Sequence, residues 1–123
     1  MNQLKTKNLT SIVAPSGIVQ EFGEYPSLPA SATANIVSYS SPVGQVTSIT
    51  NAVVSSSGGP VKVIVTKNNA IPVSVGFFSS SNPNLNLTFY PAIILQSGES
   101  IEVSAKNNTK IPQNIYGTIL GGF

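Results

Sequence analysis

Apolar and polar side chains alternate with a period of two in several windows of the chain. The clearest windows are residues 61–66, 73–78, 84–89 and 101–106, and a fifth covers residues 115–120. Successive side chains of a β-strand point to opposite faces of the sheet, so each window predicts a strand. In the first four windows one face is formed by Val61, Val63 and Val65; Val73, Val75 and Phe77; Leu85, Leu87 and Phe89; and Ile101, Val103 and Ala105.

Weaker patterns in the first half of the chain predict four more strands. Residues 9–14 and 18–22 indicate short strands on either side of a Pro-Ser-Gly turn, and residues 36–39 and 46–54 indicate two others. Clusters of Ser, Gly, Asn and Pro separate the windows, as expected for turns between strands. The total is eight or nine strands.

These patterns predict an all-β protein, an antiparallel two-sheet β-sandwich that is jelly-roll-like. The spacing of about 8 to 14 residues between strands is typical of such folds. Val, Ile and Thr, which favour strands, number 34, and nine Pro and ten Gly leave little room for a long helix. A single small barrel is the alternative. No segment has the composition of the crossover helix that a parallel α/β fold needs.

The chain length of 123 residues fits one domain. We expect residues 17–123 to form this single sandwich and residues 1–16 to form an N-terminal arm or a first strand. Residues 1–10 are polar, and residues 121–123 place a phenylalanine after two glycines, so either end is a candidate for docking on another subunit. Frayed termini are the alternative.

The composition points to a neutral surface. Only 8% of the residues are charged, as six Lys and four Glu, while 18 Ser, 12 Asn and 9 Thr supply polarity. Such a surface packs against copies of itself with little desolvation of ions, so we expect a homo-oligomer. A monomer with an unreactive surface, extracellular or thermally robust, is the alternative.

Nucleic acid and membrane are not expected as partners. The net charge is +2, but the lysines are dispersed and the chain has no Arg, whereas tight phosphate binding takes about six to ten contacts. No window reaches the roughly 18 consecutive apolar residues of a membrane span. The apolar run at residues 12–14 stops at Pro15, so no secretory signal is expected either.

Most catalytic chemistry lacks its side chains in this sequence. Without His, Cys or Asp, neither a Ser-His-Asp triad, a Cys-His pair nor a zinc site is expected. Two pairs of glutamates, Glu21 with Glu24 and Glu99 with Glu102, are spaced so that an extended chain points the members of each pair apart. A site formed between the pairs stays open, but solvated surface charge is favoured. We therefore predict no enzyme, no catalytic, cofactor-binding or metal-binding residue, and no cofactor.

Two further features of the sequence, the glycosylation sequons and the tyrosines, bear on binding. Glycosylation sequons begin at Asn8, Asn86 and Asn107, a number that chance accounts for in a chain so rich in Asn, Ser and Thr. The tyrosines, which could form a sugar-binding platform, are far apart in sequence, so filling of a core or an interface is the favoured role. They are Tyr25, Tyr39, Tyr90 and Tyr116.

Several phrases of the C-terminal 75 residues resemble small β-sandwich structural proteins of tailed bacteriophage virions. The phrases are ITN at residues 49–51, VKVIV at 61–65, FYPAIILQSGESIEV at 89–103 and IYGTILG at 115–121. In that pattern a strand that opens with Thr-Asn leads to alternating valines, a turn ending in Gly-Glu-Ser-Ile starts the next strand, and a terminal strand ends in Gly. Similar phrases occur in bacterial appendage subunits and other jelly rolls.

The resemblance implies a non-enzymatic homo-oligomer mounted on a virus particle, such as a capsid decoration protein or a head or tail accessory subunit. Its expected partners are copies of itself and other structural proteins of the particle, and its location is the virion after folding in the host cytoplasm. The resemblance carries over no catalytic residue. Two alternatives stay open: a self-assembling bacterial surface or spore-appendage filament subunit on the extracellular surface, and a carbohydrate- or receptor-binding module.

Overall fold

Two antiparallel sheets packed face to face make up the fold. The computed structural model describes residues 17–68, 71–79 and 82–123, and the predicted arm at residues 1–16 and strand at 9–14 lie outside them. Eight strands are described. They are β2 (Ile18–Leu28), β3 (Thr33–Ser40), β4 (Thr47–Ser56), β5 (Val61–Lys67), β6 (Ile71–Phe78), β7 (Asn84–Leu95), β8 (Ser100–Asn107) and β9 (Gln113–Gly122).

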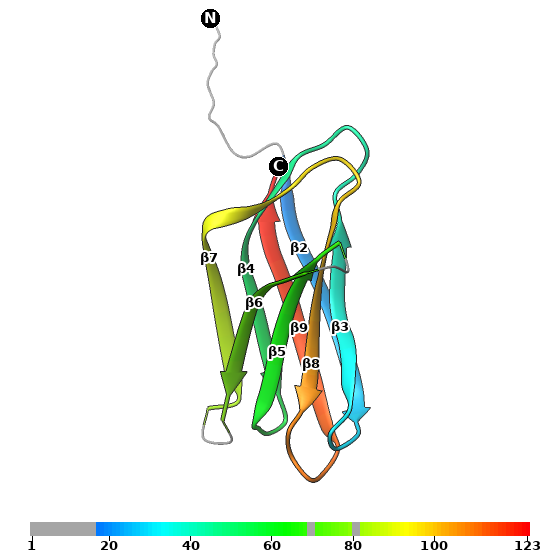
Figure 1. The fold of residues 1–123 in the computed structure, drawn as a ribbon, viewed down its shortest axis with the longest axis vertical. Helices are drawn as coiled ribbons and strands as arrows, with labels where there is room; N and C mark the ends of the chain where they lie inside the picture. Colours follow the sequence, from blue (N-terminus) through cyan, green and yellow to red (C-terminus); the bar gives the residue numbers. More distant parts are fainter. Residues whose placement is uncertain (1–16, 69–70, 80–81) are drawn as a thin grey trace, which may run out of the picture.

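The strand order is that of a jelly roll. One sheet has the order β2-β9-β4-β7 and the other β3-β8-β5-β6 (Figure 1). The pairs β2–β9, β3–β8, β4–β7 and β5–β6 form the rungs of one long antiparallel hairpin, which folds over so that both of its arms contribute to both sheets. The pairs β4–β9 and β5–β8 then join the folded halves. This arrangement confirms the predicted sandwich in place of a single barrel.

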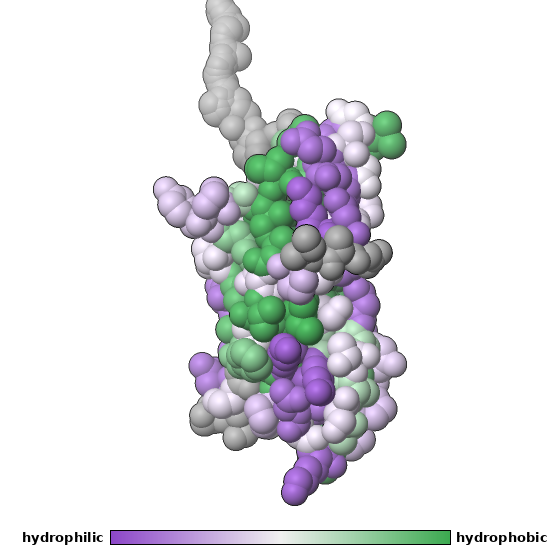
Figure 2. Space-filling model, viewed as in Figure 1, coloured by the Kyte–Doolittle hydropathy of each residue, from purple (hydrophilic) through white to green (hydrophobic). Residues whose placement is uncertain are grey.

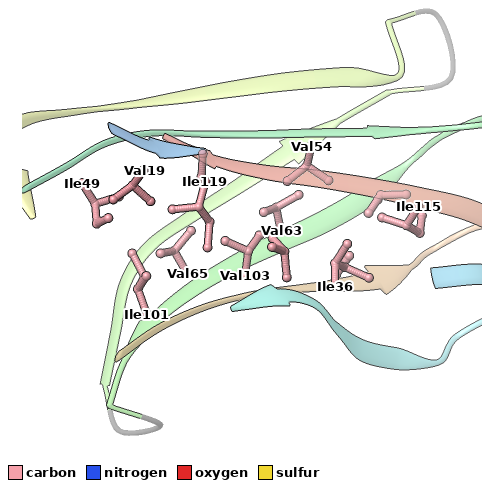
Figure 3. Packing of buried hydrophobic residues seen from close by; sticks show 14 of the residues in the cluster. Val19, Ile36, Ile49, Val54, Val63, Val65, Ile101, Val103, Ile115 and Ile119 are labelled. Carbon is pink, nitrogen blue, oxygen red and sulfur yellow. The ribbon is translucent and has the colours of Figure 1, made fainter. Parts of the chain in front are cut away.

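The hydrophobic core lies between the two sheets, and alternation along the central strands supplies it (Figure 3). The predicted apolar faces of β5 and β8 are fully buried. The alternate residues of β5, which are Lys62, Ile64 and Thr66, lie half-buried on the outer face of the sheet. Burial of one side chain of this size contributes roughly 1.5–3 kcal/mol, so this layer is the main stabilising feature. The buried cluster is Val19, Leu28, Ile36, Val37, Ile49, Ala52, Val54, Val61, Val63, Val65, Leu95, Ile101, Val103, Ala105, Ile115 and Ile119.

In strand β6 the apolar side of the alternating pattern faces outward and not toward the core. Its apolar residues Val73, Val75 and Phe77 point outward and are 45%, 46% and 65% exposed. Gly76 faces the interior, where a Cβ atom would lie 2.5 Å from Leu85 Cδ2. At Gly76 the inner side of β6 has no room for a larger side chain, because Leu85 of β7 occupies that space.

The ends of the described domain lie together and are held by the sheet. The backbone N–H of Gly17 donates to Phe123 O, and the N–H of Phe123 donates to Gly17 O, both at 3.1 Å. Strand β9 includes Gly121 and Gly122. The C-terminal glycines are therefore part of the sheet instead of a frayed end.

Candidate functional site

The glutamates considered for catalysis are divided between the two sheets. Glu21 and Glu24 lie exposed on β2, whereas Glu102 lies on β8 and Glu99 in the preceding turn. Glu102 accepts hydrogen bonds from the hydroxyls of Thr66 at 3.2 Å and Ser100 at 3.0 Å. Within residues 17–68, 71–79 and 82–123, no group of three or more acidic, His or Cys side chains could hold a metal ion.

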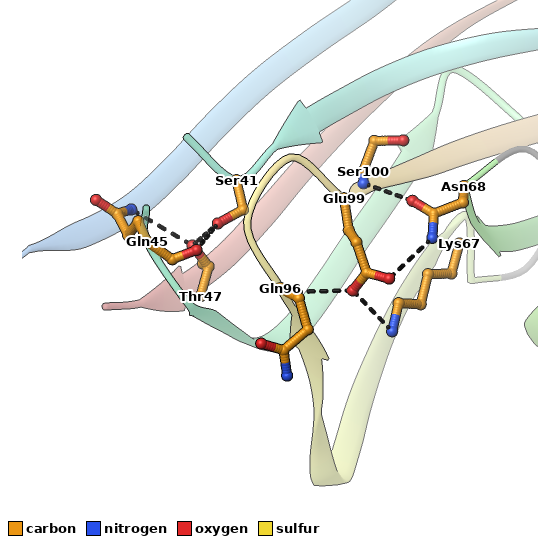
Figure 4. A network of polar contacts seen from close by, with 8 residues as sticks. All are labelled: Ser41, Gln45, Thr47, Lys67, Asn68, Gln96, Glu99 and Ser100. Carbon is orange, nitrogen blue, oxygen red and sulfur yellow. Dashed lines mark hydrogen bonds and ion pairs between the residues drawn. The ribbon is translucent and has the colours of Figure 1, made fainter. Parts of the chain in front are cut away.

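Glu99 links two turns at one end of the sandwich (Figure 4). Its carboxylate accepts a hydrogen bond from the backbone N–H of Gln96 at 2.7 Å and lies 3.2 Å from Lys67 Nζ. The amide of Asn68 also donates to it at 3.2 Å, and Asn68 Oδ1 accepts from the N–H of Ser100. The Gln96 hydrogen bond and then Lys67 lower the pKa of Glu99. A carboxylate held ionised is a poor proton donor, so this cluster is a structural link.

Replacing Glu99 with glutamine should lower the urea midpoint slightly at pH 7. The pKa of Glu99 is lower in the folded chain than in the unfolded chain, so its ionisation stabilises the fold above the ordinary glutamate pKa of about 4.3. That contribution disappears as the pH falls through the lower folded-state pKa. The effect is small because the pair is partly exposed to water.

Urea unfolding of wild type and E99Q between about pH 7 and pH 2 measures this dependence. The exposed Glu24 on β2 provides the matched control E24Q, which should shift the midpoint less at every pH. A difference between wild type and E99Q that stays constant down to the lowest pH would contradict the assignment.

The tyrosines do not gather into one platform. They lie on four strands, β2, β3, β7 and β9. Tyr39 packs against the buried cluster, Tyr116 is partly covered, and Tyr25 is 39% exposed. Tyr90 differs from them, because its side chain is 97% exposed.

The fold brings together two lysines that are far apart in the sequence. Lys62 on β5 and Lys106 on β8 are direct cross-strand neighbours on the outer face of their sheet. Two charges fall well short of the roughly six to ten contacts that hold a phosphate backbone. Among the described residues, no helix is long and apolar enough to span a membrane.

One side of the sandwich, which we call the β6–β7 flank, carries several exposed or half-buried apolar side chains. It consists of the outward side chains Val73, Val75 and Phe77 of β6 and the half-buried, inward side chains Leu85, Leu87 and Phe89 of β7. Strands β6 and β7 are the end strands of the two sheets. Figure 2 shows hydrophobic surface running down the face where β6 lies.

The opposite side, formed by β2 and β3, is closed. A Cβ atom on Gly23 would lie 2.2 Å from the carbonyl oxygen of Ile36, so the two strands approach as closely as a glycine permits. These strands contribute Val19, Leu28, Ile36 and Val37 to the buried cluster, whereas the only buried residue of β7 in it is Leu95. No described side chain of β6 belongs to the cluster. The core is therefore complete on the β2–β3 side and open on the β6–β7 side.

The β6–β7 flank has a pocket at one end and a projection at the other. The open pocket, of about 490 Å³, is lined by Pro60, Phe77, Ser79, Asn82, Asn84 and Leu85. At the other end, Thr88 pairs with Asn51 and Ile93 pairs with Ile49, so four residues of β7 face one residue of β4. The excess chain, with Tyr90, bends out of the sheet, and Figure 1 shows this sharp turn of β7 at the upper left.

Sequence alternation predicted the strands of this flank but not its exposure. An apolar face is normally assigned to the core, and nothing in the alternation of residues 73–78 says otherwise. One signal was present in the sequence: no charged residue occurs between Lys67 and Glu99, so both strands and their connection are neutral.

Comparison of the chain with family models, with curated proteins and with solved structures finds no match. The class of the protein, an eight-stranded jelly-roll sandwich in its described part, therefore rests on the strand order and register given above.

Proposed function

We propose that this chain is a non-enzymatic structural subunit of a virus particle, such as a capsid decoration protein or a head or tail accessory protein. It acts by packing against copies of itself and against other structural proteins of the particle. The β6–β7 flank carries this proposal. Val73, Val75 and Phe77 form a row of exposed apolar side chains on its outer face, and exposed apolar patches on a soluble protein mark sites of protein association.

The strand order supports the viral assignment by analogy of fold. Jelly rolls with eight strands build many viral capsid proteins, although lectins and cupins share the architecture. The neutral surface also fits dense assembly, because a subunit surrounded by identical copies would bring like charges together at every symmetric contact.

Two measurements test the proposal. Light scattering and negative-stain microscopy of the purified protein should show closed oligomers of defined symmetry. Antibodies raised against the chain should label virus particles purified from its source, and mass spectrometry of the particles should detect it. Absence from purified particles would refute the viral role.

A filament subunit is the second candidate, and the same flank favours it. Uncovered edge strands that pair head to tail, without closing a ring, generate fibres. Fibres in the negative-stain images would support this candidate over the virion subunit, and a monomer that binds a glycan array would support a binding module over both.

A further inference from the structure

The middle of each free edge of the β6–β7 flank lacks the usual protection against pairing, which is confined to Pro72 near one end of β6 and to Pro91 and the register shift toward one end of β7. Every second residue of an edge strand directs its backbone N–H and C=O away from the sheet, and proteins normally interrupt such edges with charge, proline or a bulge. The β2 edge has Glu21, Glu24 and Pro26. Residues 74–78 of β6 and 84–88 of β7 have no charge, no proline and no register shift.

We infer that a second copy of this chain occupies this flank, bound flank to flank about a two-fold axis perpendicular to the strands. This inference rests on the proposed function, since it names the partner of the same surface. A charged partner would meet no complementary charge on β6 or β7, whereas an identical neutral flank meets no repulsion. The backbone edges of like strands then face each other in antiparallel orientation, so that both sheets continue across the dimer.

Because the two ends of the flank differ, they decide whether the two-fold axis lies perpendicular or parallel to the strands. Tyr90 lies six residues from Asn84 along β7, which is about 20 Å at the usual rise of a strand. An axis perpendicular to the strands brings the Tyr90 end of each copy to the pocket at the Asn84 end of the other. An axis parallel to the strands would bring Tyr90 against Tyr90 and leave both pockets empty. Pockets of this volume hold ligands larger than a phenol ring.

The size of the flank matches that of a stable interface. Strand β6 has 8 residues and β7 has 12, which gives a mean length of about 33 Å, and two sheets with their side chains are roughly 20–25 Å wide. The flank therefore covers about 700–800 Å², close to the roughly 800 Å² that each partner buries in an interface of standard size.

Lysine substitution tests the location of the interface. Val75 is 46% exposed on the outer face of edge strand β6, so V75K should fold while placing like charges side by side on the two β6 strands that the axis brings together. Sedimentation velocity should show a dissociation constant at least tenfold higher than that of wild type. The matched control V43K changes a 91% exposed valine in the β3–β4 loop, which lies across the molecule from the bend of β7 in Figure 1, and should dimerise like wild type.

Cysteine cross-linking tests the direction of the axis, and the chain has no native cysteine to interfere. A mixture of Y90C and N84C should form a cross-linked heterodimer with a short bismaleimide, because Tyr90 of one copy faces Asn84 of the other. Y90C alone should not cross-link to itself. Self-linking of Y90C, or no cross-link in the mixture, would overturn the arrangement.

Different experimental results would overturn the inference and the proposed function. An oligomer that persists in V75K overturns the flank-to-flank contact and leaves the structural role standing. The variant I12K places the same charge in residues 1–16, and dissociation of this variant would overturn the inference in favour of that segment as the occupant. A wild type that stays monomeric at millimolar concentration also overturns the inference, while detection in particles decides the proposed function separately.

Discussion

Replacing Asn107 with alanine is expected to lower the free energy of unfolding by about 3 kcal/mol or more, since several polar groups lose one partner together. The Asn107 side chain is fully buried. Its amide donates to the carbonyl oxygens of Leu28 at 2.9 Å and Ile111 at 2.8 Å. Its oxygen accepts from the N–H of Thr109 at 2.9 Å and from the Thr109 hydroxyl at 2.6 Å.

These four bonds attach the β8–β9 loop to the end of β2. A buried donor or acceptor left without a partner costs about 1–3 kcal/mol, and alanine would remove a partner from the carbonyl of buried Leu28 and from the N–H of half-buried Thr109. Asn107→Asp should be equally harmful at neutral pH, because a carboxylate oxygen would face the two carbonyl oxygens that the amide now binds.

Urea denaturation monitored by circular dichroism measures both variants. The neighbouring Asn108 supplies a matched control, since its side chain is exposed and its backbone N–H, which donates to Pro60 O, is kept in Asn108→Ala. That control should stay within about 0.5 kcal/mol of wild type. A loss for N107A as small as that of the control would show that the loop is held by other contacts.

The role of Asn107 could not be predicted from the sequence. Asn107 begins one of three sequons in a chain with 12 Asn, and local sequence gives no indication of which amides are buried. Its partner Leu28 is 79 residues away in the sequence and meets it only once β2 pairs with β9. A buried polar hub of this kind depends on tertiary register, which a period-two pattern does not contain.

The positions of strands were predictable where the two faces of a strand differ in their contact with the core and with water. Strands β5 and β8 lie between other strands, so one face contacts the core and the other contacts water, and their alternation matches their burial. Strand β2 extends to Leu28, six residues beyond the predicted residue 22, because its outer half faces solvent and alternates weakly. The pattern predicts strands well and their ends poorly.

The candidate site was predictable only in kind. The low charge of the chain predicted a surface suited to self-packing, but it did not indicate which side. The β6–β7 flank depends on the packing of Gly76 against Leu85 and on the bend of β7 at Tyr90, where the register between β4 and β7 shifts. Alternation by itself would place the apolar residues Val73, Val75 and Phe77 of β6 in the core, whereas the structure exposes them.

Replacing Gly121 with alanine is expected to cost about 3 kcal/mol or more, as overpacking against a rigid neighbour does. A Cβ atom at Gly121 would lie 2.1 Å from the carbonyl oxygen of Ser48 and 3.1 Å from Ile49 Cα, both backbone atoms of β4. A flexible side chain could move aside, but here the β4–β9 ladder has to shift. The register between these strands already changes between Ile49 and Asn51, which is where Gly121 passes closest.

The adjacent glycine gives a control with the same substitution in the same strand. A Cβ atom at Gly122 would meet only the carbonyl oxygen of Gly17, at 3.3 Å, and neither glycine has a positive φ, so alanine fits its backbone without strain. Alanine also restricts the unfolded chain more than glycine does, so G122A should unfold within about 1 kcal/mol of wild type. Equal midpoints for G121A and G122A in thermal and urea unfolding would mean that β9 ends before Gly121. A large loss in G121A alone would show that the C-terminal glycines are a packed part of the sandwich, because a loose tail accommodates a methyl group at either position.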